Sequence, residues 1–332
     1  MNVLSLFDGI SAGRVALERA GIKIDNYYAC EIDPYAIKIA QKNYPDTIQL
    51  GSVVDVSAAD IPHKIDLIIG GSPCQGFSFA GKQLNFDDPR SQLFFEFVRL
   101  LKECKPKYFL LENVKMKKQS EDVITEMLGV SPIEINSALV SAQNRKRLYW
   151  TNINFDWNIE DQNIMLRDIL EQCPHNYTLM SDKFTSRNAN AGCLVSKDKP
   201  KARTFSAMEY VKNGRQGDYI QCDKEGRPTL CRQIGIADDI NGHDILKRVY
   251  SVDGKSPTLN TCSGGNREPK IAIDDKHYRK LTCIEAERLQ TFPDGYTEGV
   301  SNTRRYHALG NSWTVDVVCH IFNGLRWDEE TL

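Results

Sequence analysis

Short apolar runs that alternate with helix-like stretches constrain the fold of this chain more than any other feature. In the first 153 residues, five runs have the length and composition of buried strands. They are Val3 to Phe7, Tyr27 to Glu31, Ile65 to Gly70, Tyr108 to Glu112 and Arg147 to Ile153. Because strands that alternate with helices usually pair in parallel, we expect an α/β fold with a doubly wound, Rossmann-like and mostly parallel sheet.

Helical patterns fill the gaps between these runs. One spans residues 12–20 and is closed by Gly21, and a second spans residues 35–43 and stops before Pro45. A third has apolar side chains at helical spacing from Leu93 onward. Such sheets bind ligands beyond the carboxyl ends of their strands, so the residues after each run are the candidates for a functional site.

The pattern changes in the middle of the 332-residue chain. Residues 159–280 form short segments punctuated by Gly, Asn, Asp and Lys, which indicates a smaller, loop-rich domain. Helical signal returns at Thr282, which forms a capping-box pattern with Glu285. We therefore expect a main domain over residues 1–158, a second domain over 159–280, and a C-terminal segment, 281–332, that returns to the main domain.

Charge is unevenly distributed, although the net charge is −2. Residues 181–280 hold 19 Lys and Arg against 13 Asp and Glu, a balance of +6. A locally basic segment indicates contact with nucleic acid, and a solvated, lysine-rich surface is the alternative.

The ten cysteines are scattered and form no pattern of paired metal ligands, so we expect no metal site. No apolar run approaches the roughly 18 residues of a membrane span. Met1 leads directly into a strand-like run instead of an export signal. We therefore expect a cytoplasmic protein that is not bound to membrane and has free thiols.

Acidic residues and a glycine-containing turn follow the first strands. Gly9 lies in the turn after the first run, where backbone could approach a ligand, and a tight connection is the alternative. Glu31 ends the second run, where a carboxylate would meet ribose hydroxyls, and an exposed loop acid is the alternative. Asp55, followed by Val56, could accept a hydrogen bond from an adenine amino group.

Three later positions place reactive side chains at strand ends. Pro73 holds the chain in a turn and presents Cys74 at the ligand-facing edge of the sheet. Glu112 ends another run, so that Cys74 and Glu112 could face one pocket. Arg145 and Arg147 alternate at the start of the last run and therefore project to the same face.

Taken in order, these segments resemble the motifs of DNA cytosine-5 methyltransferases over nearly the whole chain. The matching segments are residues 7–13, Glu31, Asp55-Val56, Pro73-Cys74-Gln75, Glu112-Asn113-Val114, Gln143-x-Arg145-x-Arg147, Glu285-x-x-Arg288-Leu289-Gln290 and Gly310-Asn311-Ser312. Residues 7–10 and 312–313 are similar to the branch that includes the animal de novo methyltransferases. Ser11 and Ala12 stand where glycines are common in the family. The chain looks like a bare catalytic unit of bacterial or phage type.

The resemblance implies a covalent mechanism. Cys74 would add as a thiolate to carbon 6 of cytosine, which makes carbon 5 nucleophilic. Glu112 would share a proton with ring nitrogen 3 and neutralise the charge that accumulates there. Arg145 would hold the ring carbonyl oxygen and favour the thiolate, and Arg147 would brace the site through backbone or phosphate.

The resemblance also implies S-adenosylmethionine as methyl donor and S-adenosylhomocysteine as product. Phe7 would lie against the adenine, Gly9 near the methionine portion and Glu31 on the ribose hydroxyls. The expected donor-binding residues are Phe7, Gly9, Ile10, Glu31, Ile32, Asp55, Val56, Pro73, Leu93, Asn311, Ser312 and Trp313.

The implied substrate is double-stranded DNA, from which the target cytosine is flipped. Residues 159–280 would form the target-recognition domain, and the loop over residues 75–88 would close over the DNA. Gln75, Ser78 and Arg267 are the expected DNA contacts, with Thr258-Leu259 as a further candidate. The chain would act as a monomer in a bacterial or phage-infected cell. A cognate restriction endonuclease, as in restriction-modification systems, is a candidate partner.

Two other functions stay open at this point. One is RNA cytosine methylation, because related folds act on tRNA with a similar cysteine and glutamate; the long basic segment favours DNA. The other is a non-catalytic DNA-binding relative that keeps the fold without turnover. The presence of Cys74, Glu112 and Arg145 favours an enzyme.

Overall fold

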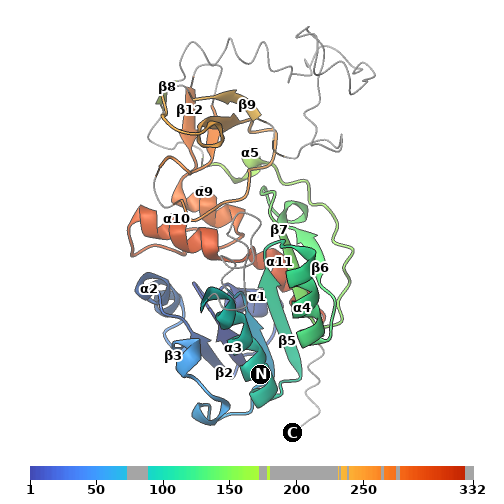
Figure 1. Ribbon diagram of the computed structural model, residues 1–332. Coiled ribbons are helices and arrows are strands. Elements are labelled where there is room, and N and C mark those ends of the chain that lie inside the picture. Colours follow the sequence, from blue (N-terminus) through green and yellow to red (C-terminus); the bar gives the residue numbers. More distant parts are fainter. Residues whose placement is uncertain are drawn as a thin grey trace.

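The chain forms two sheets with helices between and around them (Figure 1). The computed structural model of the chain describes residues 1–72, 89–171, 178–179, 231, 233–237, 239–262, 265–273 and 277–325.

The larger sheet has seven strands in the order β3-β2-β1-β4-β5-β7-β6. They are β1 (Asn2–Leu6), β2 (Asn26–Cys30), β3 (Ile48–Gly51), β4 (Leu67–Gly70), β5 (Tyr108–Asn113), β6 (Ile133–Asn136) and β7 (Lys146–Thr151). The five strands from β3 to β5 pair in parallel, whereas β7 runs antiparallel to both β5 and β6. The prediction of an α/β fold with a mostly parallel sheet is confirmed.

Helices cover both faces of this sheet, as the doubly wound arrangement requires. One face carries α1 (Ala12–Arg19), α2 (Pro34–Asn43) and α11 (Val315–Phe322), and the other carries α3 (Pro89–Cys104) and α4 (Lys118–Leu128). Val3 and Leu4, neighbours on β1, are fully buried in these two different layers. Successive side chains of a strand point to opposite faces, and each buried aliphatic side chain contributes about 1.5–3 kcal/mol. The two layers therefore fix the sheet and its strand ends.

The smaller sheet has five strands in the order β8-β12-β11-β10-β9. They are β8 (Thr178–Leu179), β9 (Gln233–Ile236), β10 (Arg248–Tyr250), β11 (Lys270–Ala272) and β12 (His277–Lys280). Short helices α5 (Leu166–Ile169) and α8 (Asp244–Lys247) accompany it, and α9 (Cys283–Leu289) and α10 (Asn302–Asn311) lie between the two sheets (Figure 1).

Short 3₁₀ helices span Val53–Asp55, Ala58–Asp60 and Ser137–Leu139. The domain boundaries at residues 158 and 280 stay predictions.

The segment that follows β10 is tied to the turn before β7. The amide of Asn144 donates to the Ser256 carbonyl (2.9 Å), and the amide of Ser256 donates to the Ala142 carbonyl (2.7 Å). The buried ammonium of Lys255 donates to three backbone carbonyls, those of Ala138, Ser141 and Ile164. An ammonium this deeply buried is stable only with such partners, so these bonds hold the two sheets in a defined relation.

None of the described helices combines the length and the apolar character that crossing a membrane requires. Across the same described ranges, no group of three or more His, Cys, Asp and Glu side chains is placed to hold a metal ion.

Candidate active site

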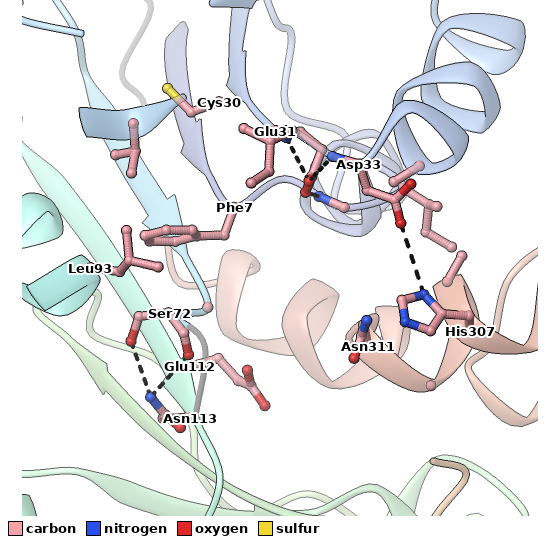
Figure 2. A pocket seen from close by; sticks show the side chains of 18 of the residues that line it. Phe7, Cys30, Glu31, Asp33, Ser72, Leu93, Glu112, Asn113, His307 and Asn311 are labelled. Carbon is pink, nitrogen blue, oxygen red and sulfur yellow. Dashed lines mark hydrogen bonds and ion pairs between the residues drawn. The ribbon is translucent and has the colours of Figure 1, made fainter. Parts of the chain in front are cut away.

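A cavity of about 470 Å³ opens where β1, β2, β4 and β5 end, and α10 forms its opposite wall (Figure 2). A volume of this size is typical of sites for small organic ligands. The lining residues are Phe7, Gly9, Ile10, Cys30, Glu31, Ile32, Asp33, Ala36, Gly51, Ser52, Val53, Gly71, Ser72, Leu93, Glu112, Asn113, Val114, Arg145, Arg147, His307, Ala308, Gly310 and Asn311. The strand ends singled out in the sequence therefore meet in one cavity.

One end of the cavity, which we call the Glu31 end, comprises Phe7, Gly9, Glu31, Ile32 and Asp33. Glu31 Oε2 accepts a hydrogen bond from the amide of Gly9 (2.8 Å), and Oε1 accepts from the amides of Ile32 (2.7 Å) and Asp33 (2.8 Å) (Figure 2). These three bonds orient the carboxylate between the end of β2 and the turn after β1.

The turn after β1 has an unusual backbone. Phe7, Gly9 and Ser11 all have positive φ angles, of 57°, 59° and 61°. A left-handed conformation costs a residue with a side chain roughly 1–2 kcal/mol, so the turn needs support. Buried Asp8 supplies it by accepting hydrogen bonds from Ser11 Oγ (2.6 Å) and the Tyr27 hydroxyl (2.8 Å). Burial raises the pKa of the Asp8 carboxyl, and these hydrogen bonds offset the rise only in part.

The other end, which we call the Glu112 end, comprises Gly71, Ser72, Glu112 and Arg147. Arg147 Nε lies 2.9 Å from Glu112 Oε1, and both side chains are mostly buried. A Cβ atom on Gly71 would lie 2.9 Å from the Trp313 indole nitrogen and 3.1 Å from Glu112 Oε2, so glycine lets β4 end close to Glu112.

Asn113 fixes the position of this end. Its side-chain amide donates to the carbonyl (3.3 Å) and the hydroxyl (3.2 Å) of Ser72 (Figure 2). The ends of β4 and β5 are thereby joined, and Ser72 is two residues before Cys74 in the sequence.

Arg145 is held differently from Arg147. Its guanidinium is buried and donates to the backbone carbonyls of Leu259 (3.0 Å), Gly310 (3.2 Å) and Ser312 (2.9 Å). These contacts differ from the expected roles, in which Arg145 was to hold the substrate ring and Arg147 was to brace the site. Arg147 contacts the carboxylate of Glu112 and donates through Nη1 to the carbonyl of Lys146 (2.8 Å), so the roles of the two arginines stay predictions.

Two buried glutamines extend this bracing network. Gln143 Oε1 accepts from the Leu259 amide (2.9 Å), and its Nε2 donates to the Leu289 carbonyl (3.2 Å). Gln290 Nε2 donates to the Leu309 carbonyl (2.7 Å). The segments that resemble family motifs around residues 143–147, 285–290 and 310–312 thus meet in one buried polar layer behind the cavity.

Among the described cysteines, only Cys30 lines the cavity. Burial raises the pKa of its thiol to about 12, so Cys30 stays protonated at neutral pH and cannot serve as a thiolate nucleophile. Cys74 lies outside the described residues, as do Pro73, Gln75 and Ser78.

Ten of the residues expected from the sequence line the cavity. They are Phe7, Gly9, Ile10, Glu31, Ile32, Leu93, Glu112, Arg145, Arg147 and Asn311. Four others do not line it. Asp55 is exposed and Val56 is buried in the core, and their place in the wall is taken by residues 51–53. Ser312 and Trp313 pack behind the wall, against Arg145 and Gly71 respectively.

Sequence reasoning missed several lining residues. Gly71 and Ser72 directly precede the Pro73-Cys74-Gln75 motif, and Asn113 and Gly310 lie inside motifs but were given no contact of their own. Asp33 likewise follows Glu31 by two positions. His307 has no such signal, because only the packing of α10 against the N-terminus of α2 brings it to the cavity.

A second cavity, of about 520 Å³, lies beside the smaller sheet. Arg248, exposed Arg267 and Lys270 line it together with Thr258 and Asn260. The buried Lys270 ammonium donates to the carbonyls at positions 266 and 268, and burial lowers the pKa of Lys270 to about 8. The expected DNA contact Arg267 therefore stands on a loop that a buried lysine holds in place.

Comparison with known proteins identifies close sequence relatives. A family model described as C-5 cytosine-specific DNA methylase matches residues 1–327. The chain is 31% identical to the orphan methyltransferase M.Rho11sI of Bacillus phage rho11s, over 82% of this chain and 69% of that protein. It is also 31% identical to the type II methyltransferase M1.ScrFI of Lactococcus lactis subsp. cremoris, over 95% of this chain and 75% of that protein.

Solved structures share the fold at lower sequence identity. The S. pombe Dnmt2 methyltransferase superimposes with a TM-score of 0.60 at 18% identity and 96% coverage of both chains. Entamoeba histolytica EhMeth superimposes with a TM-score of 0.64 at 15% identity, covering 98% of this chain and 97% of that one. Together with the match over residues 1–327, these findings show that the chain belongs to the C-5 cytosine-specific DNA methylase family.

Proposed function

We propose that this DNA (cytosine-5) methyltransferase acts through a covalent bond between Cys74 and carbon 6 of a cytosine rotated out of the duplex. The observation that carries the proposal is the ion pair of Glu112 and Arg147 at one end of a cavity whose other end offers Glu31. A carboxyl group and a guanidinium are suited to a pyrimidine ring under attack, because one can share a proton with a ring nitrogen and the other can bind a ring oxygen.

The covalent step overcomes the weak nucleophilicity of carbon 5. Attack of the Cys74 thiolate on carbon 6 forms a C–S bond and moves the electrons of the ring double bonds toward nitrogen 3. Glu112 in its protonated form gives its proton to nitrogen 3, and the ring becomes an enamine. Once carbon 5 carries the methyl group, it loses its proton to water or another weak base. The C–S bond then breaks, the 5,6 double bond returns, Cys74 leaves as thiolate, and nitrogen 3 returns its proton to Glu112.

We assign the two arginines in the order opposite to our expectation. Both arginines line the cavity, but Arg147 is the one that pairs with Glu112, so Arg147 would bind the ring carbonyl oxygen and orient Glu112. Arg145 would keep the cavity in shape by holding the backbone at Leu259 and Gly310.

Members of this family take the methyl group from S-adenosylmethionine, which when bound supplies an electrophilic methyl group on a sulfonium. The Glu31 end fits such a ligand. Ile32 lines the cavity with 75% of its surface exposed, which leaves apolar area for an aromatic ring to cover.

We propose that Phe7, Ile32 and Leu93 hold the adenine, that Glu31 accepts from the ribose hydroxyls, and that the remaining contacts come from Gly9, Ile10 and Asn311. The contacts expected of Asp55, Val56, Pro73, Ser312 and Trp313 stay predictions. The wall over residues 51–53 favours Ser52 and Val53 as neighbours of the adenine edge.

DNA is the substrate of the family. The basic cavity beside the smaller sheet supports DNA contacts by Arg267 and Thr258, and the contacts of Gln75 and Ser78 stay predictions. If Arg267 binds phosphate, the slope of log K for duplex DNA against log salt should fall by about one in Arg267→Gln. An unchanged slope would exclude that contact.

The relatives differ on whether a restriction endonuclease accompanies the methyltransferase. M.Rho11sI is described as an orphan enzyme and M1.ScrFI as a type II methyltransferase. These relatives support both a solitary enzyme and one with a restriction endonuclease, and a monomeric state stays a prediction.

The covalent step can be tested directly. Duplex DNA with 5-fluorocytosine at the target site should become permanently attached to Cys74, because fluorine cannot leave as the proton does. Cys74→Ala should neither methylate nor form the adduct, and it should still bind S-adenosylhomocysteine. Attachment at another residue, or methylation by Cys74→Ala, would exclude the assignment. Transfer of a labelled methyl group to tRNA and not to duplex DNA would favour the RNA alternative.

A further inference from the structure

The rim of the cavity at the Glu31 end is closed by two residues that have no role in the mechanism above. His307, on α10, lies with Nδ1 3.9 Å from Oδ2 of Asp33 (Figure 2). Asp33 is the N-cap of α2, and its Oδ1 accepts a hydrogen bond from the Tyr35 amide (2.9 Å). Both side chains are about one-third exposed and line the cavity from opposite walls.

Glu31 has limited capacity to bind a ribose by itself. A carboxylate offers roughly four acceptor positions, and three of those on Glu31 are used by the amides of Gly9, Ile32 and Asp33. A ribose diol carries two hydroxyl groups, so one of them needs another partner. Asp33 supplies a second carboxylate on the same rim.

A second contact joins the same two helices. The Arg304 guanidinium lies 4.1 Å from the centre of the Tyr35 ring, one turn before His307 on α10. This cation–π contact keeps its charge at all ordinary pH values, whereas a histidine changes its charge between about pH 5 and about pH 8. The C-terminal end of α10 provides Gly310 and Asn311 to the cavity wall, so a movement of α10 would change the shape of the donor site.

Several charged groups surround His307. The carboxylates of Asp33 and Glu31 come from the opposite wall, Arg304 lies on the same helix over Tyr35, and Glu112 at the far end is paired with Arg147. Asp8 is buried behind the Glu31 end.

We propose that Asp33 and His307 are positioning residues that form a clasp over the ribose of the methyl donor, and that protonation of His307 tightens this clasp. The proposal rests on the assignment of this cavity as the donor site. Asp33 accepts from the second ribose hydroxyl, and the imidazolium attracts Asp33 and draws α10 toward α2.

Direct binding measurements without DNA test the clasp. The dissociation constant of S-adenosylhomocysteine, measured by calorimetry, should be about threefold to tenfold smaller at about pH 5.5 than at about pH 8 in the wild type. His307→Gln should remove this dependence and leave the affinity near the wild-type value at high pH. Asp33→Ser keeps a side chain that caps α2, so it should remove the dependence and also weaken binding at every pH. His320→Gln, on α11 and away from the cavity lining, is the matched control and should keep the dependence.

A second ligand separates the ribose from the amino-acid part of the donor. 5′-Methylthioadenosine has the ribose and adenine but no α-amino group, and it should show the same pH dependence. The clasp is excluded if the dissociation constant depends on pH only for S-adenosylhomocysteine. It is also excluded if the pH dependence persists in His307→Gln. In both cases the assignment of the donor site stands. If the wild type binds neither ligand at any pH, the donor site fails as well, and the clasp with it.

Discussion

The two ends of the cavity are held in place in different ways. At the Glu31 end, the carboxylate accepts from three amides, two of which belong to the next two residues in the chain. At the Glu112 end, the carboxylate pairs with Arg147 on the neighbouring antiparallel strand, and Arg145 is held by carbonyls 114 to 167 positions away. Local chain geometry therefore orients one end, and contacts between distant segments orient the other.

The difference also concerns charge. Glu112 has a guanidinium beside it, whereas buried Asp8, behind the Glu31 end, is bound by two hydroxyl groups. Burial raises the pKa of Asp8, because the hydrogen bonds from these hydroxyl groups offset the loss of hydration only in part. The two ends should therefore respond differently to substitution and to pH.

Removing the acid at the Glu112 end should have the largest effect. Glu112→Gln keeps the size of the side chain but cannot give a proton to the ring, so kcat should fall about a thousandfold. The affinity for S-adenosylhomocysteine should stay within about twofold of wild type, because the ligand binds at the other end. Single-turnover methylation and calorimetry measure both quantities. A parallel loss of affinity would show that the two ends are not independent.

Substituting the two arginines separately should distinguish bracing from catalysis. Arg145→Met leaves three buried carbonyls without their donor, so the free energy of unfolding should fall by about 3 kcal/mol. Arg147→Met should change it by about 1 kcal/mol or less, while kcat falls about a hundredfold. Urea denaturation and methylation assays on both variants provide the test. The reverse pattern would restore the roles first expected from the sequence.

A change at Glu31 should affect donor binding and little else. In Glu31→Gln the side-chain NH₂ group cannot accept from the Gly9 amide, so the turn after β1 loses one of its contacts. The affinity for S-adenosylhomocysteine should fall about tenfold, with kcat at saturating donor nearly unchanged. A lower kcat at saturating donor would show that Glu31 also acts at the Glu112 end.

Asp8 should make the free energy of unfolding depend on pH. This is the smallest of the expected effects. Because its pKa is raised in the folded state, the folded chain binds this proton more tightly than the unfolded chain. The stability that Asp8 contributes is therefore fully present below its ordinary value of 3.8 and is lost as the pH rises through the folded pKa. Relative to Asp8→Asn, the wild type should lose about 1 kcal/mol across this range. A difference that does not vary with pH would indicate that the carboxyl keeps its ordinary pKa.

The sequence predicted the larger sheet well but not completely. Five predicted strands are present, because each is an apolar run buried on both faces. The strands β3 and β6 were missed, since most of their residues are exposed or only partly buried and therefore resemble loop segments. The antiparallel direction of β7 was also unpredictable from its composition, because direction depends on the hairpin that β7 makes with β6.

The candidate site, like the larger sheet, was predicted from the sequence only in part. Residues next to strand ends, such as Phe7, Glu31 and Glu112, were found because the end of a buried run is visible in the sequence. Asp55 and Val56 were expected at the adenine edge. A 3₁₀ turn leaves Asp55 exposed and Val56 buried while residues 51–53 line the cavity, so their contacts with the donor stay predictions. No sequence pattern predicted His307.

The sequence by itself determined which residue types stand at the ends of the strands and in what order, because apolar periodicity and chain connectivity are local properties. Only the tertiary structure decided which arginine meets Glu112, which one supports the backbone, and which residue of α10 faces Asp33. Those outcomes depend on the packing of segments that are distant in the sequence, where burial selects the contacts that satisfy each charged group.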